Sequence, residues 1–201
     1  MPEINSLPPE APRPLLALEH ADLAVAEKAG GIHDHPLVEA LGGFSEMADQ
    51  PPLIALSIGT LAAGLLLCRP RLAVAGARMI AAHGLATGMK TVLKRSIDRT
   101  RPRVLAEERE YIVRKGRRNE PRYNSFPSGH TAGAVAVAEA IARTHPAVAW
   151  TARGWAAMIA AIQIPRCTHY PSDIAAGAAI GWGADRLVRL AERGLRAWAA
   201  R

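Results

Sequence analysis

Long apolar stretches recur through most of the 201-residue chain, separated by short basic segments. The clearest of them, Pro51 to Cys68, contains no charged side chain. Its length is close to the roughly 17 to 25 residues that cross a bilayer as a helix. Stretches of this length are too long for typical strands, so the pattern predicts helices. Four further stretches carry at most one charged side chain each: Leu72 to Met89, Thr131 to Ala142, Ala147 to Pro165 and Ile174 to Ala184.

The setting of these helices follows from their number and composition. Taken singly, each shorter stretch also suits a buried helix of a soluble protein. Five in one small chain favour a membrane, and abundant Ala, Leu and Gly with only 4% aromatic residues is typical of closely packed membrane helices. We therefore expect an all-α, multi-pass membrane helical bundle with about five transmembrane helices. Arg78 and His83 should face its interior, and Gly84 to Gly88 should offer a small-residue packing face.

The first fifty residues are more polar and are expected to form a region of their own, 1–50, ahead of a membrane-embedded domain, 51–201. Leucines alternate irregularly with charged residues there, which fits interfacial amphipathic helices or solvated cap helices. The predicted parts are a Pro-rich tail to about Pro14, a helix from Leu15 to Ala29 and a short helix from Leu37 to Ala48.

Three local patterns carry little chemistry. No apolar segment follows a basic start at the N-terminus, so we expect no cleaved signal peptide and insertion through the internal stretches. His33 to His35, which includes Asp34, lacks a second ligand cluster to complete a metal site, and a loop is the preferred interpretation. Cys68 and Cys167 form no disulfide framework, and Cys167 is interpreted as a small packing residue.

The net charge of +7 raises the question of nucleic-acid binding. Basic residues cluster between Lys94 and Arg122 and again between Arg186 and Arg201, with almost no aromatic residues for base stacking. Such clusters beside a membrane attract anionic lipid headgroups instead. We therefore expect membrane lipids and a phosphorylated substrate as partners, and no nucleic acid.

Two histidine motifs point to chemistry on an anion. Pro127-Ser128-Gly129-His130 runs directly into an uncharged stretch, so Ser128 is predicted as an N-cap. The N–H groups of a helix start attract anions, and Gly129 lets the backbone approach closely, with His130 beside the bound group. Further along, His169 and Asp173 are four residues apart, so the carboxylate can accept the imidazole N–H and make the other nitrogen a better nucleophile.

Cations complete the pattern at Lys94 and Arg101, the latter followed by Pro102. Arg grips phosphate oxygens with its planar fork, and Lys acts as a point charge. Each motif alone has a plainer explanation. The basic cluster could anchor membrane topology, the Pro-Ser-Gly-His segment could be only a turn, and the His-Asp pair could be a structural hydrogen bond.

Together, in this order, Lys-x6-Arg-Pro, Pro-Ser-Gly-His and His-x3-Asp resemble the type-2 phosphatidic acid phosphatase superfamily, over about Leu53 to Leu190. The resemblance implies a metal-independent phosphatase without a cofactor. It implies that His169 is the nucleophile that forms a phosphohistidine, that Asp173 orients it, and that His130 protonates the leaving oxygen. The implied phosphate cradle consists of Lys94, Arg101, Ser128 and the Gly129 amide.

One position departs from the family pattern, which usually has Arg six residues before the nucleophilic histidine. Here that position is Gln163, and Arg166 is the nearest cation. We favour Arg166 as a phosphate ligand over Gln163. A degenerate, inactive site is a third possibility, and retention of the other motif residues argues against it.

The predicted function is hydrolysis of a lipid phosphate or diphosphate, such as a polyprenyl phosphate or diphosphate, phosphatidylglycerol phosphate or phosphatidic acid. Alternatives of other classes are a general acid phosphatase, a haloperoxidase-like enzyme that uses vanadate, and a pseudoenzyme that binds lipid phosphates. We expect an integral, multi-pass protein of the plasma (inner) membrane. The motifs must share one face, and membrane members of the family usually place it outside, although both faces are rich in Arg.

Overall fold

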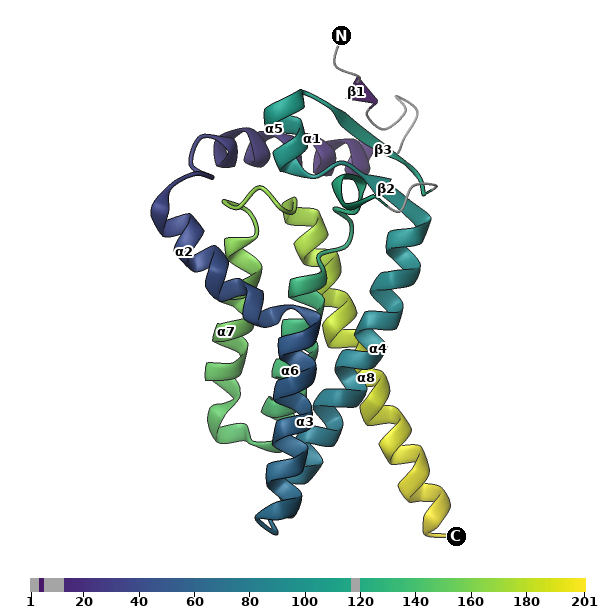
Figure 1. The fold of residues 1–201 in the computed structure, drawn as a ribbon. Coiled ribbons are helices and arrows are strands. Elements are labelled where there is room, and N and C mark those ends of the chain that lie inside the picture. Colours follow the sequence, from purple (N-terminus) through teal and green to yellow (C-terminus); the bar gives the residue numbers. More distant parts are fainter. Residues whose placement is uncertain (1–3, 6–12, 117–119) are drawn as a thin grey trace.

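The computed structural model describes residues 4–5, 13–116 and 120–201, and most of them are helical. Its main body is a bundle whose helices run alongside one another (Figure 1). α6 lies at the centre and packs against the other four helices of the bundle. Its buried face is built mainly of alanine, which lets the neighbouring helices approach closely. The bundle consists of α3 (Gln50–Leu66), α4 (Pro70–Ser96), α6 (Gly129–Thr144), α7 (Ala149–Ile162) and α8 (Pro171–Ala199).

These helices correspond to the five apolar stretches of the sequence. α3, α6 and α7 have 17, 16 and 14 residues, while the longer α4 and α8 carry several charged side chains. Among the residues that the structure describes, no helix is at once long and apolar enough to cross a membrane.

The region before the bundle forms α1 (Arg13–Gly30), α2 (Pro36–Ser45) and the 3₁₀ helix η1 (Glu46–Ala48). Both helices lie close to their predicted places. The Pro-rich tail falls almost entirely outside the described residues. α1 packs against α5 (Pro102–Glu108) and α8 and lies across one end of the bundle (Figure 1). The segment around His33 is a turn, as expected, and His35 accepts a hydrogen bond from the Leu37 amide at the start of α2.

A small sheet beside α1 corrects the expectation of a purely helical fold. β2 (Ile97–Arg99) pairs antiparallel with β3 (Tyr111–Lys115), and β1 (Ile4–Asn5) pairs parallel with β3. The strands are short, and charged residues interrupt their apolar pattern, which hides them in the sequence. They hold the basic segment after α4 in a fixed path. The remaining short elements are η2 (Pro121–Tyr123) and η3 (Pro146–Val148).

Two glycines of α8 allow it to approach α6. A Cβ at Gly177 would lie 2.5 Å from the Ser128 carbonyl oxygen, and one at Gly181 would lie 2.4 Å from the Ala132 carbonyl oxygen. This packing fixes the second and third turns of α8 against the start of α6. The small-residue face predicted at Gly84 to Gly88 makes no such close contact through its glycines, because a Cβ at Gly84 or Gly88 would meet nothing within 4 Å.

A charged cluster joins three helices toward the opposite end of the bundle. Arg78 of α4 holds both oxygens of Glu192 of α8 at 2.9 Å. Arg143 of α6 donates to Glu192 at 2.9 Å and to Asp185 at 2.8 Å. Arg78 and the buried His83 therefore face the interior of the bundle, as predicted.

Candidate active site

The fold brings the predicted motif residues to one end of the bundle, where α4 ends and α6 and α8 begin (Figure 1). The connections from α4 to α6 and from α7 to α8 both lie at this end. The connections from α3 to α4 and from α6 to α7, with the C-terminus, lie at the other. A backbone hydrogen bond of 3.0 Å from the Ser128 N–H to the Asp173 carbonyl joins the second motif to the third.

His169 is buried just before α8, and its hydrogen bond differs from the expected one. Its Nδ1 lies 2.7 Å from the backbone carbonyl oxygen of Ser125 but 3.8 Å from the nearer oxygen of Asp173. A carbonyl only accepts, so Nδ1 carries the proton, and Nε2 is left with its lone pair. The carboxylate supplies nearby negative charge rather than the direct hydrogen bond that the spacing predicted.

Burial is the main cause of the low pKa of His169, which falls to about 4, further lowered by Arg101 and Lys94 and opposed by Asp173. The imidazole is therefore neutral at physiological pH. A neutral imidazole with a defined tautomer can attack phosphorus.

Asp173 lies inside a dense set of donors. Its carboxylate accepts from Arg99 at 2.7 Å, from the Ser125 hydroxyl at 2.6 Å and from the Tyr170 amide at 2.9 Å. Burial alone would raise the pKa of Asp173, but His169, Arg99 and the Ser125 hydroxyl lower it to about 2. The group stays ionised and balances positive charge that develops on His169.

Arg99 is the main feature of the site that sequence reasoning missed. It is buried in β2, pairs with Asp173, and pairs through its other terminal nitrogen with Asp22 of α1 at 2.8 Å. Its guanidinium also lies 4.1 Å from the centre of the Tyr170 ring. Asp22 in turn accepts from the backbone amide and the hydroxyl of Ser172 at the start of α8. The N-terminal helix is thus connected, through Arg99 and Asp173, to the surroundings of the predicted nucleophile.

A second missed cation is Lys90, one turn before Lys94 on the same face of α4. Its Nζ lies 3.2 Å from where a Cβ of Gly129 would be. Spacing of four from Lys94 was the available sequence signal. Lys94 itself donates to the Asn124 carbonyl at 2.9 Å. Burial, with Arg101 and Lys90 nearby, lowers the pKa of Lys94 to about 8.

Ser128 is the N-cap of α6, as predicted. Its hydroxyl accepts from the Thr131 amide at 3.4 Å and lies 2.9 Å from the Thr131 hydroxyl. The first N–H groups of a helix attract anions, so Gly129 presents a positive backbone end close to Lys90.

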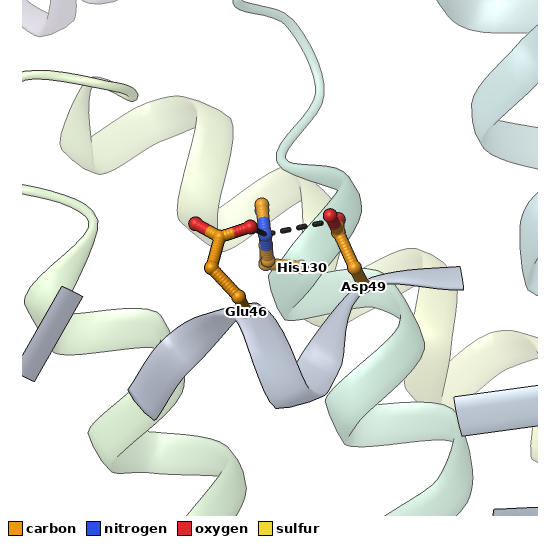
Figure 2. A group of neighbouring side chains, drawn as sticks. All are labelled: Glu46, Asp49 and His130. Carbon is orange, nitrogen blue, oxygen red and sulfur yellow. Dashed lines mark ion pairs between the residues drawn. The ribbon is translucent and has the colours of Figure 1, made fainter. Parts of the chain in front are cut away.

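His130 faces two carboxylates from the segment that precedes α3 (Figure 2). Its Nε2 lies 3.0 Å from Asp49 and 3.6 Å from Glu46. Among the described residues these three form the only group of three or more His, Cys, Asp or Glu side chains whose ligand-type atoms all lie within 4.8 Å of one another. Two carboxylates and an imidazole could coordinate a divalent cation. However, Glu46 is already paired with Arg166 at 2.6 Å.

Gln163 and Arg166 occupy different environments. Gln163 is fully buried, its amide nitrogen reaches the Ser45 hydroxyl and the Ile159 carbonyl, and its amide oxygen accepts from Thr168. Arg166 is partly exposed and lines a cavity of about 490 Å³ whose polar walls also contain Arg101 and Arg103. Of the two, Arg166 is the side chain that can meet a ligand.

Cys167 precedes the nucleophile position in a left-handed conformation with φ of 52°. Its thiol is buried, and burial raises the pKa of that thiol. A thiol of this kind is protonated and inert, which agrees with a packing role.

Comparisons with known proteins find the same fold in two solved structures. The fold is similar to the crystal structure of a transmembrane PAP2-type phosphatidylglycerolphosphate phosphatase from Bacillus subtilis, with a TM-score of 0.63 and 20% identity over 89% of this chain and 87% of that one. It is also similar to LpxE of Aquifex aeolicus, with a TM-score of 0.62 and 23% identity over 82% of this chain and 92% of that one. No curated protein sequence matches the chain.

Fold and family together define a phosphatase. The sequence profile of the PAP2 superfamily matches residues 75–195, which include the three motifs. The chain belongs to the PAP2 superfamily, the family whose motifs its sequence resembles.

Proposed function

We propose that the protein hydrolyses a lipid phosphate or diphosphate, without a metal, through a phosphohistidine on His169. The observation that carries this proposal is the hydrogen bond from His169 Nδ1 to the Ser125 carbonyl, because it leaves Nε2 as the nucleophilic nitrogen. The pKa of His169, about 4, keeps that lone pair free of a proton at neutral pH.

The first step forms a bond between Nε2 and phosphorus and breaks the bond to the leaving oxygen. His130 donates a proton to that oxygen, so the alcohol or phosphate departs neutralised. Lys94, Arg101, Arg166 and the Gly129 amide hold the equatorial oxygens, where charge must be stabilised. In the second step water attacks phosphorus, His130 takes its proton, and inorganic phosphate leaves with His169 restored.

The outer surface of the bundle supports a lipid substrate and a membrane setting. Large apolar side chains are exposed on several helices that surround α6, far more than single scattered residues. In this proposal the bundle of α3, α4, α6, α7 and α8 crosses the bilayer. The site lies beyond its outer face, on the helix ends that carry Lys90, Lys94, His130 and Asp173. Examples of these exposed side chains are Ile54, Leu56, Ile58, Leu66, Val74, Met158, Trp150, Trp182 and Leu190.

A panel assay tests this function. Detergent-purified protein would be given prenyl, glycerolipid and soluble phosphates with EDTA present, and phosphate release compared for wild type, His169→Ala and His145→Ala. His145 follows α6 at the opposite end of the bundle and serves as the control. We expect release from lipids that only His169→Ala abolishes, together with loss of the acid-labile, base-stable phosphoenzyme.

Other outcomes distinguish the alternatives. Release from soluble esters alone would indicate a general acid phosphatase. Peroxide-dependent halide oxidation with added vanadate would indicate a haloperoxidase-like enzyme. Lipid binding without turnover would indicate a pseudoenzyme.

A further inference from the structure

The segment from Ser45 to Asp49, which lies outside the family motifs, supplies two acidic side chains beside His130 (Figure 2). Asp49 Oδ1 lies 3.0 Å and Glu46 Oε2 3.6 Å from His130 Nε2. Both carboxylates therefore face the nitrogen of the side chain to which we assign proton transfer.

Asp49 occupies the N-cap of α3, where a carboxylate normally accepts from the first amides of its own helix. Its side chain makes no such capping bond. The usual helix-stabilising contact is forgone, and the carboxylate is directed to His130 instead.

Glu46 is fixed by a relay of hydrogen bonds. Its other oxygen accepts from Arg166 at 2.6 Å, and Arg166 also donates to the Ser45 hydroxyl at 2.7 Å. The Ser45 hydroxyl in turn donates to the Gly42 carbonyl at 2.7 Å. A carboxylate held in this way has little freedom to turn away from the imidazole.

The charges around His130 compete. Burial lowers the pKa of His130, Asp49 and Glu46 oppose that effect, and Arg166 adds to it. Lys90 faces the same group from α4: burial lowers the pKa of Lys90, and Asp49 opposes that change. The net pKa of His130 is lowered, and the two carboxylates limit that fall.

We propose that Glu46 and Asp49 are positioning residues that hold the His130 imidazole in the orientation from which it donates a proton to the leaving oxygen. This inference rests on the proposed function. Because Nε2 faces the carboxylates, the N–H given to the oxygen as its bond to phosphorus breaks is that of Nδ1. The neutral imidazole regains a proton on Nδ1 from the attacking water. The carboxylates themselves exchange no proton and contact no substrate.

The test compares leaving groups that differ in their need for a proton. Wild type, Asp49→Asn, Glu46→Gln and the exposed control Glu27→Gln would be assayed with a simple alkyl phosphate and with p-nitrophenyl phosphate, whose phenolate departs unaided. Loss of a general acid typically lowers the rate by about 10² to 10⁴. We expect Asp49→Asn to lower kcat for the alkyl phosphate by about tenfold to hundredfold, with a loss for p-nitrophenyl phosphate at least tenfold smaller.

The pH profile adds a readout that a merely structural role would not move. Without the Asp49 carboxylate the pKa of His130 falls further. The fall of kcat for the alkyl phosphate on the alkaline side of the pH profile therefore moves to lower pH in Asp49→Asn. Asp49→Glu, which keeps the charge, should return that fall toward its wild-type pH. Glu46→Gln should act in the same direction, and it provides a second variant if Asp49→Asn does not fold.

Two results would overturn the inference. One is an equal loss for both substrates with an unchanged pH profile of kcat. The other is that added Zn²⁺ inhibits wild type but not Asp49→Asn or Glu46→Gln, while both variants keep full turnover of the alkyl phosphate. Glu46, Asp49 and His130 would then form a cation site. The proposed function fails separately, by retained phosphoenzyme formation in His169→Ala.

Discussion

Arg99 and Asp173 lie 2.7 Å apart in a buried ion pair, and the same guanidinium holds Asp22 at 2.8 Å. One side chain therefore connects the carboxylate beside His169, the proposed nucleophile, to the N-terminal helix. Burial opposes the charge of Arg99, but the two carboxylates and Tyr111 raise its pKa, so the guanidinium is always ionised.

Arg99→Ala should be strongly destabilising. It leaves two buried carboxylates without their partner, and breaking a buried pair in this way typically costs about 3 to 5 kcal/mol. Thermal unfolding in detergent should show a clear drop in Tm together with lost phosphate release. Arg95→Ala, at a neighbouring exposed position, is the control. An unchanged Tm for Arg99→Ala would mean that water replaces the pair.

Lys94→Arg should extend activity to higher pH. The pKa of Lys94 is about 8, so its charge is present below that pH and lost above it. With p-nitrophenyl phosphate, where departure needs no proton, kcat/KM of wild type should fall above about pH 8, following that pKa. In Lys94→Arg the fall should move upward, because guanidinium stays charged. Lys115→Arg, exposed in β3, is the control and should leave the pH profile of kcat/KM unchanged. If the alkaline fall of kcat/KM stays at its wild-type pH in Lys94→Arg, Lys94 does not bind the phosphate.

Arg166→Ala should lower catalytic efficiency, whereas Gln163→Ala should lower stability. Arg166 lines the polar cavity, so its loss should lower kcat/KM about tenfold or more, in line with removal of a charge-assisted hydrogen bond. Gln163 is wholly buried and fully bonded, so its loss should mainly lower Tm. Measuring kcat/KM and Tm for both variants, with the exposed Arg193→Ala alongside, separates the roles. The reverse pattern would make Arg166 structural and return Gln163 to the phosphate.

Gly177→Ala should push the N-terminal part of α8 away from the start of α6. The added methyl would lie 2.5 Å from the Ser128 carbonyl oxygen, so the helices must shift, at a typical cost of about 1 to 3 kcal/mol. Because Asp173 lies one turn earlier on α8, activity should fall with Tm. Gly183→Ala offers the matched control, since a Cβ there meets nothing within 4 Å and alanine favours a helix. Equal Tm values for the two variants would show that the close approach is not needed.

The sequence predicted the helices and the gathering of the motifs well, because both depend on local signals. Apolar stretches mark α3, α4, α6, α7 and α8, and the order of the motifs along antiparallel helices places them at one end. The N-cap at Ser128 follows from its position before an uncharged stretch. The division of the chain at residue 50 and the roles of the site residues stay predictions.

The features of the site that could not be predicted from the sequence depend on contacts between distant residues or on backbone geometry. Asp22 and Arg99 are 77 positions apart, and a charged residue on an irregularly amphipathic helix gives no sign of its partner. The carboxylates at Glu46 and Asp49 reach His130 only because η1 folds back over α6. The close approach of α8 depends on which face Gly177 presents, which spacing alone does not decide.

The partner of His169 Nδ1 is a main-chain oxygen, so this hydrogen bond does not depend on which side chain occupies position 125. Every amino acid brings the same carbonyl, so no substitution at position 125 can delete it. Asp173 can be exchanged without removing the acceptor that selects the imidazole tautomer. The tautomer of His169 is therefore set by the backbone path of the loop before α6, whereas the side chain of Ser125 acts on Asp173.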